Sequence, residues 1–196
     1  MIRLIRTTVF LPVVLIVLSV SCQRGDSPKP RAYFRIALPE KSYQYFDTVY
    51  PYRFEYPEYA TFKPDTGDSG EPYWGDIVFP EFSGRIHLSY KPVKSPDDLS
   101  GFFEDARTFV HRHIPKATAI RDEMFVHEEQ NVYGMLFHIR GREAASALQF
   151  YATDSTNHFL RGALYFDVTP NNDSLSPVIG FIEEDIRHLL ETMSWD

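Results

Sequence analysis

The sequence predicts an α+β fold in which two helices pack against one antiparallel sheet of about six to seven strands. Three observations support this class. Two segments, 95–114 and 176–195, carry apolar residues at helical spacing. The last extended segments follow one another with short turns between them, as in an antiparallel meander. Aromatic residues make up 15% of the chain, which gives it enough apolar area to bury in a core.

The first part of the predicted domain is an irregular arm that leads into a strand and a hairpin. Residues 33–61 are dense in aromatic residues and prolines, and only residues 52–56 alternate as a strand does. Residues 74–79 and 85–90 then predict two strands. The segment 80–84 is short enough to connect them as a hairpin.

The remaining elements are a helix, a meander and a second helix. The first helix, 95–114, has Ser95 as its predicted N-cap, followed by a proline and two acids, which helix starts favour. The second helix, 176–195, has Pro177 near its start. Between them, alternating or apolar runs predict four antiparallel strands at 119–127, 132–140, 147–153 and 159–168.

This order of elements, together with the opening strand YRFEYP, resembles the PsbP/Mog1-like sandwich. The resemblance implies a fold that is used mostly by binding and assembly proteins, and it is an analogy between folds. We expect residues 33–196 to form one globular domain.

The first 21 residues predict an export signal. Arg3 and Arg6 precede an apolar run at 7–20 that is too short to span a membrane. Ser21 and then Cys22, the only cysteine, follow this run and resemble the lipobox of bacterial lipoproteins. The resemblance implies that the thiol of Cys22 carries a lipid and that the mature protein is anchored to a membrane. A free thiol in an ordinary signal peptide is the alternative.

Residues 22–32 predict a lipidated, flexible tether, because they are rich in proline, glycine, serine and charged side chains. The segment QRGDS holds one acid, whereas bacterial lipoproteins that are exported to the cell surface typically carry an acidic cluster at this place. We therefore expect a lipoprotein of the cell envelope that faces the periplasm.

Charge and motifs exclude several classes of function. The formal net charge is −7 at pH 7, which disfavours nucleic acid as a partner. The sequence contains no His-Glu-x-x-His motif, no set of cysteine ligands, no Gly-x-Ser-x-Gly motif and no glycine-rich phosphate loop. We therefore expect no metal, no cofactor and no enzymatic activity.

The stretch TDSTNHFLRGALYF, residues 153–166, holds our candidate interaction surface: Asp154, Asn157, His158 and Arg161. Because Asp and Asn side chains hydrogen-bond their own backbone in turns, a hairpin corner is the alternative interpretation. A hydrolase that uses His158 with Asp154 is a further alternative, and it requires both side chains to meet in a pocket beside a nucleophile.

Long blocks of the sequence resemble the gliding-motility lipoprotein GldD family of Bacteroidota. They are PKPRAYFRIALPEKSYQYFDTVYPYRFEYPEYA, GRIHLSYKPV, QFYATDSTNHFLRGALYF and PNNDSLSPVIGFIEEDIRHLLETMSW. The resemblance implies an envelope lipoprotein required for gliding motility, with other gliding or type IX secretion proteins as its partners. It brings no catalytic residues, and only the lipidated cysteine carries over, to Cys22. Our main hypothesis is a scaffolding or assembly component.

The alternative function is an envelope lipoprotein that binds a small ligand or a glycan. The aromatic residues of the arm suggest this alternative, since aromatic rings stack on sugars and on apolar ligands. The residues concerned are Tyr33, Phe34, Tyr43, Tyr45, Phe46 and Tyr50. The alternative interpretation is that these rings simply cover the edge of a sheet.

Overall fold

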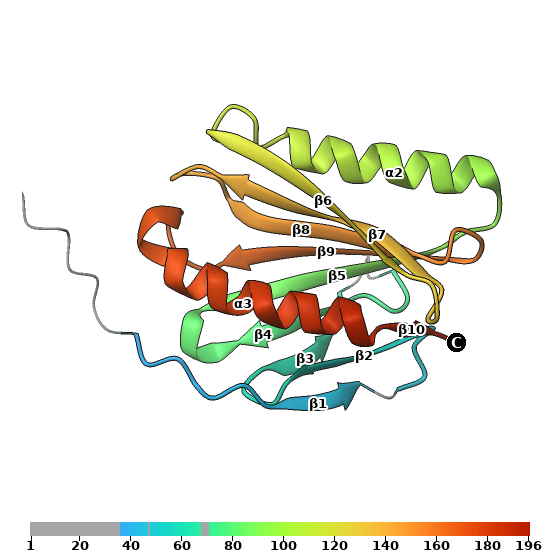
Figure 1. Cartoon of the computed structure of the whole chain (residues 1–196), viewed down its shortest axis with the longest axis horizontal. Helices are drawn as coiled ribbons and strands as arrows, with labels where there is room; N and C mark the ends of the chain where they lie inside the picture. The colour runs from blue at the N-terminus through green and yellow to red at the C-terminus, as the bar shows by residue number, and fades with distance from the viewer. Residues whose placement is uncertain (1–35, 47, 68–70) are drawn as a thin grey trace, which may run out of the picture. The chain divides into compact units, whose positions relative to one another are not determined.

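The part of the chain that the computed structural model describes contains ten strands and two α-helices (Figure 1). The structure describes residues 36–46, 48–67 and 71–196. The predicted signal, Cys22 and the predicted tether lie outside these residues, as do Tyr33 and Phe34.

Seven strands form one antiparallel sheet in the order β3-β4-β5-β9-β8-β7-β6. The four predicted meander strands are neighbours in it, and β5 pairs with β9 along its whole length, from Gly84 opposite Phe166 to Pro92 opposite His158. This pairing joins the N-terminal hairpin to the meander. The strands are β3 (Thr61–Pro64), β4 (Gly75–Phe79), β5 (Gly84–Pro92), β6 (Ala119–His127), β7 (Val132–Arg140), β8 (Ser146–Thr153) and β9 (His158–Phe166).

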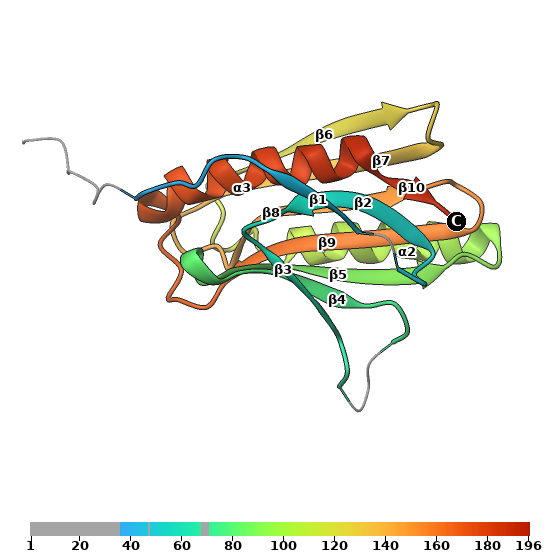
Figure 2. The ribbon, with the colours of Figure 1, turned by 90° about the horizontal axis from the view of Figure 1, so that it is seen from below.

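The two long helices cover opposite faces of the seven-stranded sheet, as Figure 2 shows. Helix α2 (Pro96–His111) begins as predicted, because the Ser95 side chain accepts a hydrogen bond from the Asp98 backbone N–H. Helix α3 (Asn172–Thr192) begins before its expected start. The predicted helix had Pro177 in its first turn, where the missing N–H of a proline costs nothing. In the structure, α3 begins at Asn172, so Pro177 lies inside the helix.

A second, three-stranded sheet was not expected. It has the order β1-β2-β10 and consists of β1 (Tyr43–Phe46), β2 (Tyr52–Pro57) and β10 (Ser194–Trp195). The arm is therefore irregular only in part. A short 3-10 helix, η1 (Pro80–Phe82), makes the predicted turn between β4 and β5.

The main core lies on the face of the large sheet that α3 and the small sheet cover. Its largest fully buried side chains come from both sheets and from α3: Tyr52, Phe54, Ile77, Phe79, Ile86, Leu88, Leu136, Leu148, Phe150, Leu160, Leu164 and Ile182. A smaller apolar cluster joins α2 to the other face through Ala106, Val93 and Phe159. The predicted α+β class, with helices on an antiparallel sheet, is confirmed.

Candidate functional site

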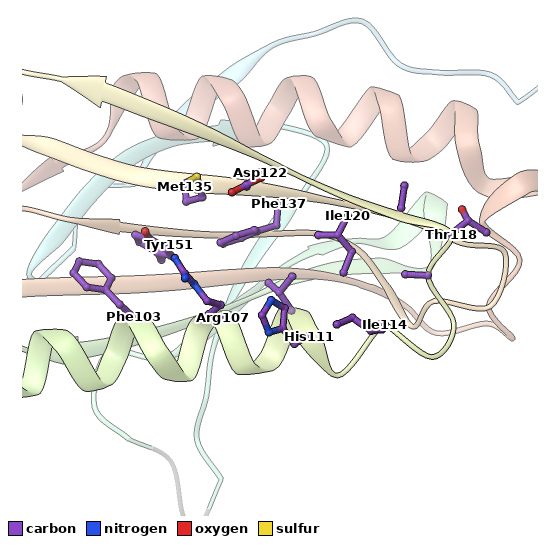
Figure 3. A pocket seen from close by; sticks show the side chains of 13 residues that line it. Phe103, Arg107, His111, Ile114, Thr118, Ile120, Asp122, Met135, Phe137 and Tyr151 are labelled. Atoms are coloured by element: carbon purple, nitrogen blue, oxygen red, sulfur yellow. The ribbon is translucent and has the colours of Figure 1, made fainter.

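A groove runs between α2 and the edge of the large sheet (Figure 3). It forms where α2, which packs over β8 and β9 through Phe103 on Tyr151 and Phe159, reaches β7 only near its C-terminal end, through Val110 on Phe137. The cavity has a volume of about 640 Å³. Its lining consists of Phe103, Arg107, Val110, His111, Ile114, Ala117, Thr118, Ala119, Ile120, Asp122, Met135, Phe137 and Tyr151.

The groove is apolar along its floor and carries charged groups at its sides. Figure 3 shows Arg107 extending from α2 toward the strands, while Asp122 stands on β6. Among the described residues, neither Arg107 nor Asp122 is in an ion pair within 4.0 Å. Both charges are therefore available to a partner.

Strand β6 forms the open edge of the large sheet beside this groove. It pairs with β7 on one side, and no strand of the described chain pairs with its other side. Two of its apolar side chains face solvent: Met124 is 73% exposed and Val126 is 48% exposed. An edge strand of nine residues with unpaired backbone groups can accept a further strand.

Asp154 organises the turn between β8 and β9. Its carboxylate accepts hydrogen bonds from the backbone N–H groups of Thr156, Asn157 and His158, at 2.8 to 3.0 Å, and from the Thr156 hydroxyl. Burial acts to raise the pKa of Asp154, but these hydrogen bonds outweigh it and hold the pKa below its usual value. The arrangement is the hairpin corner of our alternative interpretation.

The other three residues of the candidate surface point in different directions. His158 lies against the small sheet, where its Nδ1 is 2.8 Å from the Tyr90 hydroxyl and its ring stacks on Trp195. Arg161 lies on the opposite face of β9, beneath α2. Asn157 is exposed in the turn. The structure therefore does not bring the four side chains together as one surface, since alternate residues of a strand face opposite ways.

This geometry also separates the pair that a hydrolase would need. The carboxylate of Asp154 is engaged by the turn, and it holds the backbone N–H of His158, while the imidazole is hydrogen-bonded to Tyr90. The two side chains do not converge on a nucleophile.

The described aromatic residues of the arm are used in packing. Phe46 is buried and stacks on Phe54 at a centroid distance of 4.8 Å, and Tyr50 contacts the same cluster edge-on. Tyr43 stacks on His188 at 3.7 Å. Only Tyr45 among these four residues is largely exposed. The arm therefore packs Phe46 and Tyr50 into the main core.

A buried ionic cluster on α3 was missed from the sequence. Asp185 is 1% exposed, and its carboxylate accepts hydrogen bonds from Lys41 Nζ at 2.6 Å, from the Tyr59 hydroxyl at 2.6 Å and from the Tyr43 hydroxyl at 3.2 Å. Burial and then Asp185 raise the pKa of Tyr43 to about 12. Asp185 follows two other acids on a helix, where a run of acids usually indicates a solvated face, but the structure buries this one. Its spacing from the buried Ile182 and Leu189 placed it on the apolar face.

Comparison with known proteins gives the family. The model of the gliding motility lipoprotein GldD family matches residues 23–195. The chain belongs to the gliding motility lipoprotein GldD family. Membership extends over almost all of the chain beyond the predicted signal, and the family's description makes the protein a lipoprotein of gliding motility.

Two further comparisons add less. A solved structure, the cyanobacterial PsbP (CyanoP) from Synechocystis sp. PCC 6803, is similar with a TM-score of 0.46 and 12% identity, covering 81% of this chain and 95% of that one. Among curated proteins, no relative matches the chain.

The described residues contain no helix that is long and apolar enough to cross a membrane. They also contain no group of three histidine, cysteine or acidic side chains placed to hold a metal ion.

Proposed function

We propose that the protein is a non-enzymatic assembly subunit of the gliding and type IX secretion machinery. In this proposal, lipid on Cys22 holds the protein to an envelope membrane, the tether of residues 22–32 separates the domain from the lipid, and the domain faces the periplasm. Other envelope proteins of the same machinery are its partners. Membership of the GldD family supports the link to gliding motility.

The observation that carries the proposal is the open edge of β6 beside the groove. Its unpaired backbone groups offer hydrogen bonds to an extended segment of a partner, and alternate side chains of that segment would reach the apolar floor of the groove. Met124 and Val126 extend the apolar surface beyond the groove. The occupant that fits is a strand of another envelope protein with apolar residues at every second position.

Photo-crosslinking in living cells tests this proposal. A benzophenone amino acid replaces Met124, at the open edge, and in a matched control it replaces Val168, which is also exposed but follows β9. We expect adducts with envelope proteins of the gliding or secretion machinery from position 124 and few from position 168. Equal adducts at both positions, or adducts only between copies of this chain, would contradict the proposal.

A charge at the interface provides a second measurement. Met124→Asp leaves the folded state intact, because the side chain already faces solvent. It should reduce adducts captured by a crosslinker placed at Ile114, across the groove. Spreading on a surface or secretion should fall in parallel if the partner is part of the machinery.

A further inference from the structure

A second, smaller cavity lies on the other flank of α2. Its volume is about 260 Å³, and it lies between α2, β5 and β9. Of the residues that the structure describes, none lines both this cavity and the groove. Its lining consists of Trp74, His87, Ser89, Lys91, Phe102, Asp105, Ala106, Phe109, Phe159 and Arg161.

Arg161 is the most unusual group in this cavity. Its guanidinium lies 4.5 Å from the centroid of the Phe109 ring and donates a hydrogen bond of 2.6 Å to Gln149 Oε1. Burial lowers its pKa, and Tyr165 opposes that effect. Within the described part of the chain, no carboxylate lies within 4.0 Å of it. Arg161 is partly buried, and a cation removed from water without a counterion is costly for the folded state.

The hydrogen bonds of Arg161 do not supply the missing negative charge. Gln149 accepts from Arg161 and donates its Nε2–H to His113 Nε2 at 2.9 Å. The imidazole must therefore present a bare nitrogen, which makes it neutral. Burial and the charge of Arg161 lower the pKa of His113, in agreement with this tautomer. The network orients Arg161 and leaves its charge uncompensated.

The walls of the cavity are aromatic and carry a second cation. Trp74, Phe102, Phe109 and Phe159 provide flat apolar surfaces, and Lys91 Nζ lies 5.2 Å from the centroid of the Phe102 ring. Asp105 is the one acid of the lining, against two cations. His87 is engaged outside the cavity, with its Nδ1 2.8 Å from Asp76.

We propose that this cavity binds a small organic anion, with its carboxylate on Arg161 and its flat apolar body between the aromatic side chains. The cavity is smaller than sites for drug-sized ligands, so the ligand is a compact free acid such as an arylacetic acid. A guanidinium matches a carboxylate in charge and in its paired geometry. This inference goes beyond the proposed assembly role and does not depend on it.

Calorimetric titration of the folded domain tests the inference with two nearly isosteric pairs of probes: phenylacetate with phenylacetamide, and naphthalene-1-acetate with its amide. We expect the acid of at least one pair to bind, and we expect its amide to bind more weakly by a factor of about ten or more. The reason is that only the acid pairs with the guanidinium. Equal affinity for acid and amide, or no binding of either acid up to millimolar concentration, would overturn the proposal.

Arg161→Gln should remove the preference for the acid. Arg107→Gln, which removes a guanidinium from the groove, is the matched control and should retain that preference. Arg161→Gln should also be at least as resistant to unfolding as the wild type, since a partly buried charge without a counterion is gone. If Arg161→Gln does not fold, two other measurements replace it. They are the affinity of Lys91→Gln for the acid, which should fall, and quenching of Trp74 fluorescence by the acid in a Trp195→Phe background. An unchanged affinity together with no quenching would contradict the site.

Discussion

The carboxylate of Asp185 connects side chains from distant parts of the chain. It lies on the apolar face of α3 and is 1% exposed, so its charge is acceptable only with Lys41 and the two tyrosine hydroxyls around it. Lys41 also lies 3.5 Å from the centroid of the Phe181 ring. These contacts tie the start of the described chain to its last helix.

Asp185→Ala should therefore lower the free energy of unfolding by about 3 kcal/mol, because it leaves a partly buried ammonium without its counterion. Glu184→Ala is the control, since Glu184 is largely exposed and lies 3.8 Å from the same ammonium. Its loss should change the free energy by about 0.5 kcal/mol or less. Urea unfolding measures both variants, and equal effects would show that the buried pair has no special weight.

The ion pair of Glu123 with Arg187 joins β6 to α3 and predicts a dependence of stability on pH. Hydrogen bonds from Arg187 lower the pKa of Glu123 from 4.5 to about 2. Because the folded state holds the lower pKa, this stabilisation is complete above pH 4.5 and is lost as the pH falls toward 2. The carboxylate is partly exposed, which reduces the effect.

Urea unfolding at about pH 5.5 and about pH 3 checks this prediction. Glu123→Gln should show a smaller loss of stability between the two values than the wild type does. Glu129→Gln, which changes an exposed acid in the neighbouring turn, should behave as the wild type. An unchanged loss in Glu123→Gln would assign the acid sensitivity to other groups.

At the scale of elements, a glycine in β9 leaves room for an aromatic ring of β8. Gly162 lies opposite Phe150, and a Cβ atom there would stand 2.2 Å from that ring. The aromatic side chain thus occupies the space over the glycine. Gly101 in α2 is the contrasting case, because a Cβ atom at this position would have no neighbour within 4 Å among the described residues.

Two alanine substitutions should consequently have opposite signs. Gly162→Ala should lower the free energy of unfolding by about 1 to 3 kcal/mol, since Phe150 must leave its rotamer or the strands must separate. Gly101→Ala should raise it by about 0.5 to 1 kcal/mol, because alanine restricts the unfolded chain and favours the helix. Thermal or urea unfolding measures both, and destabilisation by Gly101→Ala would indicate a contact of α2 with another molecule or segment.

The elements also show what could be predicted from the sequence. Strands with clear alternation and a helix with a serine cap were predicted close to the bounds that the structure shows, because these signals are local. Strands β1, β3 and β10 were missed, since each has at most four residues and its pairing depends on distant segments. The groove and the smaller cavity were not predictable either, because both depend on where α2 crosses the sheet.

At the scale of the whole molecule, membrane attachment is expected to depend on Cys22. Cys22→Ala should abolish labelling by radioactive palmitate and move the protein from the membrane to the soluble fraction, because the acyl chains provide the anchoring free energy. Fractionation and labelling of cells check this. A control variant, Ser27→Ala, should leave both unchanged. Labelled protein in the Cys22→Ala variant would place the lipid elsewhere.

Strand β2 has one neighbour from near the start of the described chain and another from its last residues, since β1 and β10 flank it. Synthesis runs from the N-terminus to the C-terminus, so the small sheet lacks its third strand until Ser194 and Trp195 have emerged. Removal of residues 194 and 195 would leave that side of β2 without a partner. The small sheet therefore depends on a contact between the two ends of the described chain.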